Sequence, residues 1–455
     1  YNVMVKLKNA ADPDRMLNPG TIITDDPQLH LKDIKLSPAV QEEVDRCVEC
    51  GYCEPVCPSR DLTLTPRQRI VVQRAIVQAH ADGDEELAAQ LSADEQYPVI
   101  QTCAVDGMCQ TNCPLHINTG DLVRRLRAEG NPQVWQGVWD VAAKGWGPFV
   151  SAASLGMNAV RPIPTRATNT VLDVARSIVG ADRVPLLSEE LPAGGRRRSS
   201  GHRRGPAGRP EVVYLPACVN TMFGSAVPQE ETLEFSVLSL LTAAGIGVTV
   251  PQGIEAVCCG TPWKSKGMTT GYATMRHRVV DIMQEATHGG ELTVISDAVS
   301  CSEGFVHELE YEGVTGIRVV DAVQYIADEL LPVLPDLPKL HSAALHPTCS
   351  STRMSWNDAL HRCAQTIADE VVVVDDWGCC GFAGDRGMLH PELTESATAR
   401  EAAQLRTREF DVYLSANRTC EIGMQRATGK PWRHVLSVLA ERMVEFAPAL
   451  SLIHI

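Results

Sequence analysis

Two runs of cysteines carry the clearest chemistry in this chain. The first reads Cys47-Val-Glu-Cys50-Gly-Tyr-Cys53-Glu-Pro-Val-Cys57-Pro58, and the second reads Cys103-Ala-Val-Asp106-Gly-Met-Cys109-Gln-Thr-Asn-Cys113-Pro114. Both follow the C-x2-C-x2-C-x3-C-P spacing with which bacterial ferredoxins hold iron–sulfur clusters, except that an aspartate replaces one cysteine of the second run. Soft thiolates suit the iron of such clusters. The spacing therefore predicts two clusters and an electron-transfer function.

In this motif the fourth cysteine of each run ligates the cluster of the other run. The first predicted [4Fe-4S] set is Cys47, Cys50, Cys53 and Cys113, and the second is Cys103, Cys109 and Cys57 with Asp106 at its open corner. A carboxylate is a harder ligand than a thiolate. The second cluster is thus expected either as [4Fe-4S] with an aspartate ligand or as [3Fe-4S] without the corner iron. A plain turn at Asp106-Gly107 is the alternative.

Eight further cysteines recur in two similar units in the second half of the chain. Each unit has an early cysteine, a Cys-Cys-Gly and a late cysteine, and each cysteine falls where a strand is expected to end. The candidate metal ligands are Cys218, Cys258, Cys259 and Cys301 in the first unit, and Cys349, Cys379, Cys380 and Cys420 in the second. Adjacent cysteines are too cramped for an ordinary disulfide, but both can reach one cluster.

Other readings of the cysteines and one histidine are open from the residues alone. Zinc is the main alternative to iron, because four-cysteine zinc spacings overlap with these. Disulfides are disfavoured, because clustered cysteines in a long chain indicate metal ligands in a reducing compartment. Cys363 falls within an expected helix and is predicted to be a core residue. His346 is a candidate to support the nearby Cys349, with a core or loop role as the alternative.

Composition narrows the class of protein. A chain of 455 residues with 44% hydrophobic residues is long enough for several packed domains. The net charge of −15 argues against nucleic acid as a partner, because phosphate binding needs a basic face. No apolar run has the roughly 20 residues that a transmembrane helix needs, so we expect a cytoplasmic protein whose contact with the inner face of the membrane is at most peripheral. No catalytic residue is predicted.

The elements that must position these cysteines divide the chain into segments. Thr65 and Pro66 open an expected helix between the two runs, and Thr119 is expected to cap another. Strand-then-helix alternation in each later unit predicts a parallel sheet, whose ligands gather at the carboxyl ends of its strands. The expected domains are an α-helical dicluster ferredoxin domain (36–130), a helical connector (131–190), a disordered linker (191–210) and two α/β cysteine-rich repeats (211–335 and 340–449).

The linker and the two chain ends complete the prediction. Residues 194–206 are rich in Gly, Arg, Ser and Pro without periodicity, which is typical of a solvated linker; binding of an anionic partner is the alternative. Residues 450–455 (Leu-Ser-Leu-Ile-His-Ile) look like a translated adapter sequence. The start at Tyr1, without methionine, suggests a piece of a longer parent protein.

Together the motifs resemble a known family. The run from Cys47 to Ser59, followed by Leu64-Thr-Pro-Arg-Gln-Arg-Ile70, is similar to the iron–sulfur region of large FAD-linked D-lactate dehydrogenases. The second run, with Asp106 and the following Ile117-Asn-Thr-Gly-Asp-Leu-Val123, resembles the same region. The resemblance implies a flavin domain of the vanillyl-alcohol-oxidase type ahead of the helical domain. It also implies two cysteine-rich domains behind it, like those of glycolate oxidase and heterodisulfide reductase iron–sulfur subunits.

The resemblance further implies that residues 1–25 are the C-terminal remnant of an α+β flavin domain, with Asn18, Pro19 and Gly20 near the FAD. One departure concerns the repeats, which end in Cys-x2-Cys in heterodisulfide reductase. Here Ala298 and Asn417 replace the first cysteine of each such pair. Non-cubane clusters are therefore doubtful, and each repeat is expected either to hold an ordinary [4Fe-4S] cluster or to be empty.

The function implied is the iron–sulfur portion of an FAD-dependent D-lactate (D-2-hydroxy acid) dehydrogenase. Electrons from reduced FAD would pass through the [4Fe-4S] clusters to a quinone, a cytochrome or another carrier. The first alternative is a separate iron–sulfur subunit of a glycolate oxidase or anaerobic glycerol-3-phosphate dehydrogenase type of complex. The alternative of another class is a zinc-stabilised scaffold without redox activity.

Overall fold

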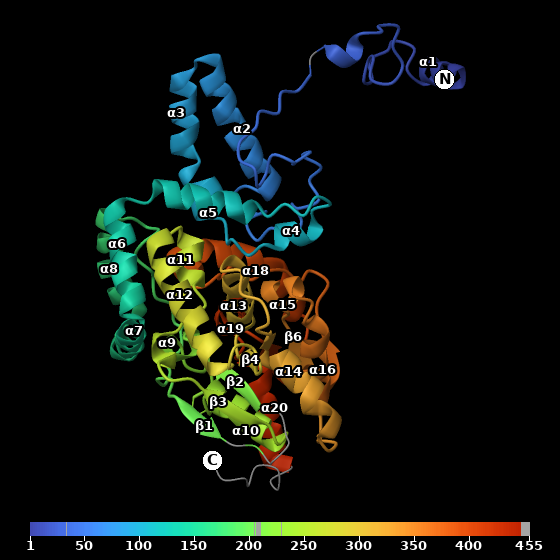
Figure 1. The fold of residues 1–455 in the computed structure, drawn as a ribbon. Helices are drawn as coiled ribbons and strands as arrows, with labels where there is room; N and C mark the ends of the chain where they lie inside the picture. Colours follow the sequence, from blue (N-terminus) through green and yellow to red (C-terminus); the bar gives the residue numbers. More distant parts are fainter. Residues whose placement is uncertain (33, 204, 206–210, 229, 447–455) are drawn as a thin grey trace.

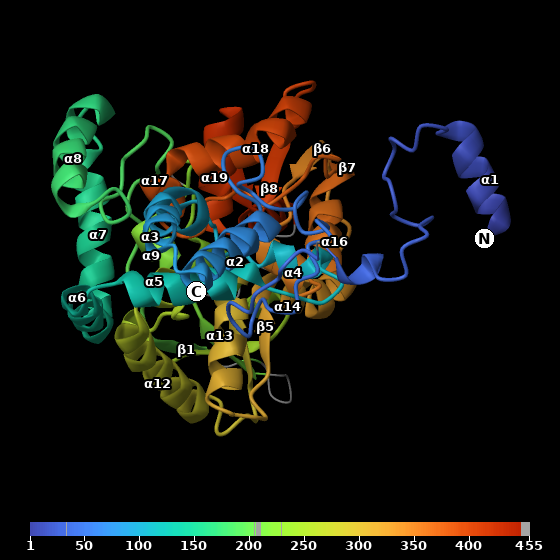
Figure 2. The same ribbon diagram turned by 90° about the horizontal axis from the view of Figure 1, so that it is seen from above.

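The computed structural model describes residues 1–32, 34–203, 205, 211–228 and 230–446. A helical domain lies above two α/β repeats, and the N-terminal segment stands apart from both (Figure 1). Seen from above, the two repeats lie side by side beneath the helical domain (Figure 2). The adapter-like residues 450–455 lie outside the described residues.

The N-terminal segment holds helix α1 (Asn2–Ala11) and a short 3₁₀ helix, Leu29–Leu31. Asp12 closes the turn after α1, because its carboxylate accepts the backbone N–H groups of Met16 and Leu17, both at 2.9 Å. Asn18 and Gly20 follow with positive φ angles of 42° and 76°. A flavin-binding role for Asn18, Pro19 and Gly20 remains a prediction.

Short helices build the ferredoxin-like domain. They are α2 (Pro66–Asp82), α3 (Glu85–Asp94), a π-helical turn (Gln96–Gln101), α4 (Met108–Asn112) and α5 (Thr119–Gly130). Residues 36–130, all of them described, contain no strand. Thr65 is the N-cap residue of α2 as expected, and its backbone N–H donates to Gln68 Oε1 at 2.8 Å. The expected cap of α5 is wrong by one residue, because Asn118 accepts the Gly120 N–H at 3.0 Å.

The connector consists of three regular helices, α6 (Gln133–Lys144), α7 (Trp146–Val160) and α8 (Thr165–Val179). The structure then departs from the disordered linker expected over 191–210. Strand β1 (Gly201–Arg203) pairs antiparallel with β3 (Gly247–Val250). The Arg198 side chain is buried and donates to the carbonyls of Pro216, Glu255 and Val257 at 2.9–3.1 Å. Hydrogen bonds to backbone carbonyls of the first repeat thus hold a segment whose composition predicted a solvated linker. Residues 204 and 206–210 lie outside the described residues.

The first repeat forms a sheet of order β1-β3-β2-β4-β5, in which all pairs except β1–β3 are parallel. Its further strands are β2 (Glu211–Leu215), β4 (Thr293–Ser296) and β5 (Val319–Asp321). Its helices are α9 (Val219–Met222), α10 (Leu233–Ala243), α11 (Thr261–Lys266), α12 (Thr269–Ala286), α13 (Val299–Tyr311) and α14 (Ala322–Glu329). The expected βα alternation is present, with β5 and four of these helices added to it.

The second repeat has the same plan. Its sheet, of order β7-β6-β8-β9, is wholly parallel and comprises β6 (Leu340–Leu345), β7 (Ala368–Val372), β8 (Val412–Ser415) and β9 (Trp432–His434). Its helices are α15 (Cys349–Arg353), α16 (Asn357–Ile367), α17 (Arg386–Leu389), α18 (Pro391–Leu405), α19 (Arg418–Thr428) and α20 (Val435–Phe446). Because β3-β2-β4-β5 and β7-β6-β8-β9 correspond, the two repeats place their cysteines equivalently.

One hydrophobic core runs through both repeats, where α10 packs on α20 and α14 on α16. Cys363 lies in this core on α16 and is fully buried, which agrees with the core role predicted for it. Within the described ranges, no helix combines the length and apolar character needed to cross a membrane.

Candidate metal centres

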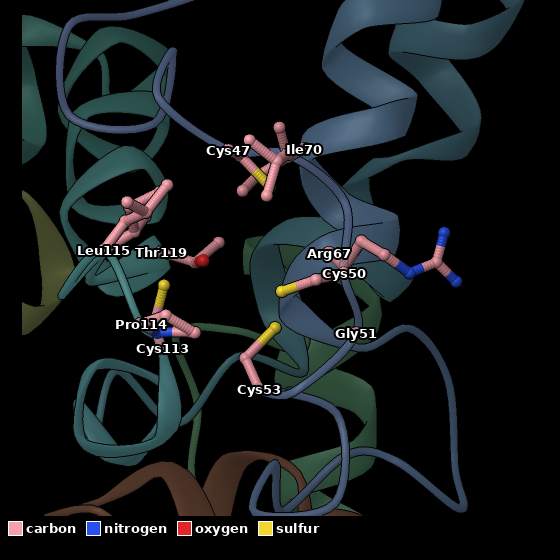
Figure 3. A pocket seen from close by; sticks show the side chains of 12 residues that line it. Cys47, Cys50, Gly51, Cys53, Arg67, Ile70, Cys113, Pro114, Leu115 and Thr119 are labelled. Carbon is pink, nitrogen blue, oxygen red and sulfur yellow. The ribbon is translucent and has the colours of Figure 1, made fainter.

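The first predicted cysteine set comes together around a cavity. Cys47, Cys50 and Cys53 line it from the first run, and Cys113 lines it from the second run. Figure 3 shows their sulfur atoms directed into the space between the two loops. Gly51, between two of these cysteines, has a φ of 85°, which lets the loop curl around the cavity. Cys50 is exposed, so this set lies at the surface of the protein.

The second predicted set is buried. Cys57, Cys103 and Cys109 all lie inside the helical domain, and the guanidinium of Arg69 lies among them. Arg69 donates to the Cys57 sulfur at 3.6 Å and to Ser59 Oγ at 2.8 Å. Burial lowers the pKa of Arg69, but the charges of Cys103 and Cys57 raise it overall. A buried cation beside three thiolates would offset the negative charge of a bound cluster.

Asp106 is half-buried, and it faces two parts of the protein. It lies close enough to Cys57 and Cys109 for its charge to raise the pKa of both thiols. Its side chain also lies near the thiol of Cys379 in the second repeat, which acts to lower the pKa of Asp106 against the larger effect of burial. Burial raises the pKa of Asp106, and its Oδ2 has no hydrogen-bond partner among the described residues. The carboxylate thus stands between the second ferredoxin set and the cysteines of the second repeat.

The first repeat brings its four cysteines together at the carboxyl ends of its strands. The sulfur atoms of Cys218 and Cys258 are 3.5 Å apart. Hydrogen bonds from Cys258 and Cys301 lower the pKa of Cys259. Gly260 then turns with a φ of 69°, and a side chain there would collide with Glu308 and Tyr272. The pKa of Cys218 is lowered as well, whereas the pKa values of Cys258 and Cys301 are raised. Two of the four thiols are therefore poised as thiolates, the form of cysteine that binds metal.

The second repeat repeats this arrangement and adds a histidine. The sulfur atoms of Cys380 and Cys420 are 3.5 Å apart, and the neighbouring Cys349 raises the pKa of Cys379. His346 follows strand β6 and lies, with Cys380 and Cys420, in a group whose ligand atoms are all within 4.8 Å of one another. Burial lowers the pKa of His346, but Glu401 and Cys380 raise it to about 10. Glu401 and Cys380 therefore both lie close enough to His346 to interact with its imidazole.

Arg353 joins the three cysteine-bearing units. It lies at the end of α15 in the second repeat, donates to the Asp106 carbonyl at 3.5 Å and pairs with Glu303 of the first repeat at 2.5 Å. Glu303 also accepts from Ser350, the residue after Cys349, at 2.6 Å. A side chain at Gly107 would collide with the Arg353 guanidinium. We call Asp106, Glu303, Arg353 and Cys379 the junction.

A polar cavity opens beside the first repeat. Its lining includes Ala217, the residue before Cys218, and its side walls come from both repeats. Several of its polar side-chain atoms lack a hydrogen-bond partner among the described residues, on Asn220, Thr221, Arg418 and Gln425. Thr221 and Arg418 are buried as well. These unpartnered atoms are buried in the wall of the cavity, close to a predicted metal ligand.

All sixteen cysteines are free thiols, so the donors needed for metal binding are available. The four predicted sets would hold iron–sulfur clusters or zinc, and their assignment as ligands remains a proposal. Sequence reasoning missed Arg69, Arg353 and the partner of His346. Arg69 lies in the segment 64–70 that resembles the iron–sulfur region of the D-lactate dehydrogenases, so that resemblance could have singled it out. Neither spacing nor periodicity connects His346 to Glu401.

Comparison with known families identifies two domains. Residues 43–117 match the family model of the 4Fe-4S dicluster domain, and residues 343–425 match that of the cysteine-rich domain. The chain carries an iron–sulfur electron-transfer module. Neither match includes residues 1–25, and the predicted flavin remnant remains without support.

Two curated proteins are similar over most of this module. The glycolate oxidase iron-sulfur subunit of Escherichia coli (strain K12) is 23% identical over 417 residues, which cover 87% of this chain and 93% of that protein. An uncharacterized iron-sulfur protein of Methanococcus maripaludis is 19% identical over 425 residues, which cover 92% of this chain and 72% of that protein. The similarity to a subunit of an oxidase indicates an oxidoreductase-related role for the module.

Proposed function

We propose that this chain is the electron-transfer portion of a flavin-linked 2-hydroxy-acid dehydrogenase. The observation that carries the proposal is the spatial order of the cysteine sets from the surface inward. One set lies at the surface, the next is buried behind it, and the junction leads from there to the second repeat. Oxidation of a 2-hydroxy acid to a 2-oxo acid releases two electrons, and iron–sulfur clusters accept electrons one at a time.

The residues of this chain would hold and insulate the clusters. Cys47, Cys50, Cys53 and Cys113 would bind the cluster nearest the flavin, because only this ferredoxin set includes an exposed cysteine. Burial of Cys57, Cys103 and Cys109 would exclude water from the second cluster, while Arg69 offsets its charge. FAD would belong to the partner domain or subunit that oxidises the hydroxy acid.

Two arrangements fit this function. In one, a flavin domain precedes the chain, as in D-lactate dehydrogenases that resemble it in the two cysteine runs. In the other, the chain is a separate subunit, as is the glycolate oxidase iron-sulfur subunit to which it is similar. Reduction of the purified chain by a D-lactate-oxidising or a glycolate-oxidising flavoprotein would decide which substrate class feeds it.

The test of the proposal is metal and sulfide analysis of the purified protein. We expect about seven to eight iron and about eight sulfide per chain from the ferredoxin domain, with a brown colour that bleaches on addition of dithionite. Zinc without acid-labile sulfide would contradict the proposal and would leave the non-redox scaffold as the explanation of the cysteine sets.

A further inference from the structure

His346 is held as a metal-binding histidine usually is. Its ring is fully buried, and Nδ1 lies 2.8 Å from Glu401 Oε1 on α18, which fixes the orientation of the imidazole. Its Nε2 has no hydrogen-bond partner among the described residues. A carboxylate on one ring nitrogen commonly orients a histidine whose other nitrogen binds metal.

The donors around His346 have the spacing of ligands to one metal atom. The ligand atoms of His346, Cys380 and Cys420 lie within 4.8 Å of one another. Metal–nitrogen and metal–sulfur bonds of roughly 2.0–2.3 Å allow one metal atom to reach such a group. Imidazole and thiolate together suit zinc and iron, and both metals are borderline in softness.

The first repeat lacks this donor. Leu215 precedes Pro216 and the early Cys218, while His346 precedes Pro347 and the early Cys349. Leu215 is an apolar residue of the core. Two repeats with the same sheet and the same cysteine pattern therefore differ in one ligand atom.

We propose that the second repeat holds a mixed imidazole–thiolate metal centre to which His346 contributes Nε2, whereas the centre of the first repeat is bound by thiolates alone. The metal is the iron of a cluster or a zinc ion, which share this ligand chemistry. The proposal is independent of which flavin enzyme reduces the module. A cluster with a nitrogen ligand has a higher reduction potential than one with thiolates only, as Rieske centres show.

The test compares the holoprotein with His346→Leu, which makes the second repeat like the first. His434→Leu is the matched control, since His434 is also a buried histidine of this repeat but lies outside the group around Cys380. Metal content is measured in all three proteins. Pulsed EPR is recorded on reduced wild-type protein labelled with ¹⁴N- or ¹⁵N-histidine.

Two outcomes support the proposal and distinguish the metals. With iron, a strong histidine-nitrogen coupling changes with the isotope and is absent from His346→Leu. With zinc, about one ion per chain is lost in His346→Leu and kept in His434→Leu. The absence of histidine coupling, together with equal metal contents in both variants, would overturn it. Should His346→Leu fail to fold, His346→Cys provides a substitute ligand, and it must keep the metal while losing the nitrogen signal.

Discussion

Cys113→Ala should abolish the cluster of the first cysteine run, although Cys113 belongs to the second run. Its sulfur lines the same cavity as Cys47, Cys50 and Cys53. A cubane cluster that loses one thiolate at the protein surface is exposed to water and oxygen, so we expect loss of about four iron atoms per chain. Iron analysis and the EPR spectrum of the reduced protein measure the effect.

The cross-run arrangement makes a sharper prediction for pairs of variants. Cys113→Ala and Cys50→Ala should give the same residual spectrum, and Cys57→Ala should match Cys109→Ala. Cys363→Ala is the control, because this thiol is buried in the core of the repeats and bonds only the Val323 carbonyl, at 3.8 Å. Spectra that pair within each run, Cys113 with Cys109 and Cys57 with Cys50, would show that the cysteine sets are wrongly assigned.

Asp106→Cys should convert the second cluster from a labile to a stable one. With a carboxylate at the corner, the wild-type protein isolated in air should show a [3Fe-4S] signal of about one spin per chain, which declines when iron is added. A fourth thiolate at position 106 would keep the corner iron, and the signal should fall close to zero. Low-temperature EPR of the air-isolated proteins measures the change.

An unchanged spectrum is the other possible outcome of this experiment. If Asp106→Cys leaves the spectrum unchanged, the aspartate is not a ligand at the corner of the cluster, and its role is at the junction with Cys379. Asp94→Cys, at an exposed position of α3, controls for the addition of a thiol and should retain the wild-type signal.

The parts of the fold and site that could be predicted are those encoded locally. The Thr65-Pro66 helix start and the strand-then-helix alternation of the two repeats are present as predicted from local patterns. The meeting of Cys113 with the first run followed from the geometry of the motif rather than from sequence proximity. These signals need only short-range rules.

The remaining features depend on contacts between distant segments. Arg198 is buried because carbonyls of the first repeat accept hydrogen bonds from its guanidinium. The residues next to Arg198 in the sequence do not predict these bonds. The Glu401 that orients His346 comes 55 positions later, and the Arg353 contact with Asp106 spans 247 positions. Hydrophobic periodicity predicts which face of an element is buried, but it does not predict which polar residue will be the partner on that face.

The junction also constrains how the protein is made. Cys57, Cys103 and Cys109 are buried, and the Arg353 guanidinium of the second repeat lies against Gly107 beside them. Docking of the helical domain on the repeats therefore covers part of the surface next to this set. We expect cofactor delivery to the helical domain to be easier before the domains close.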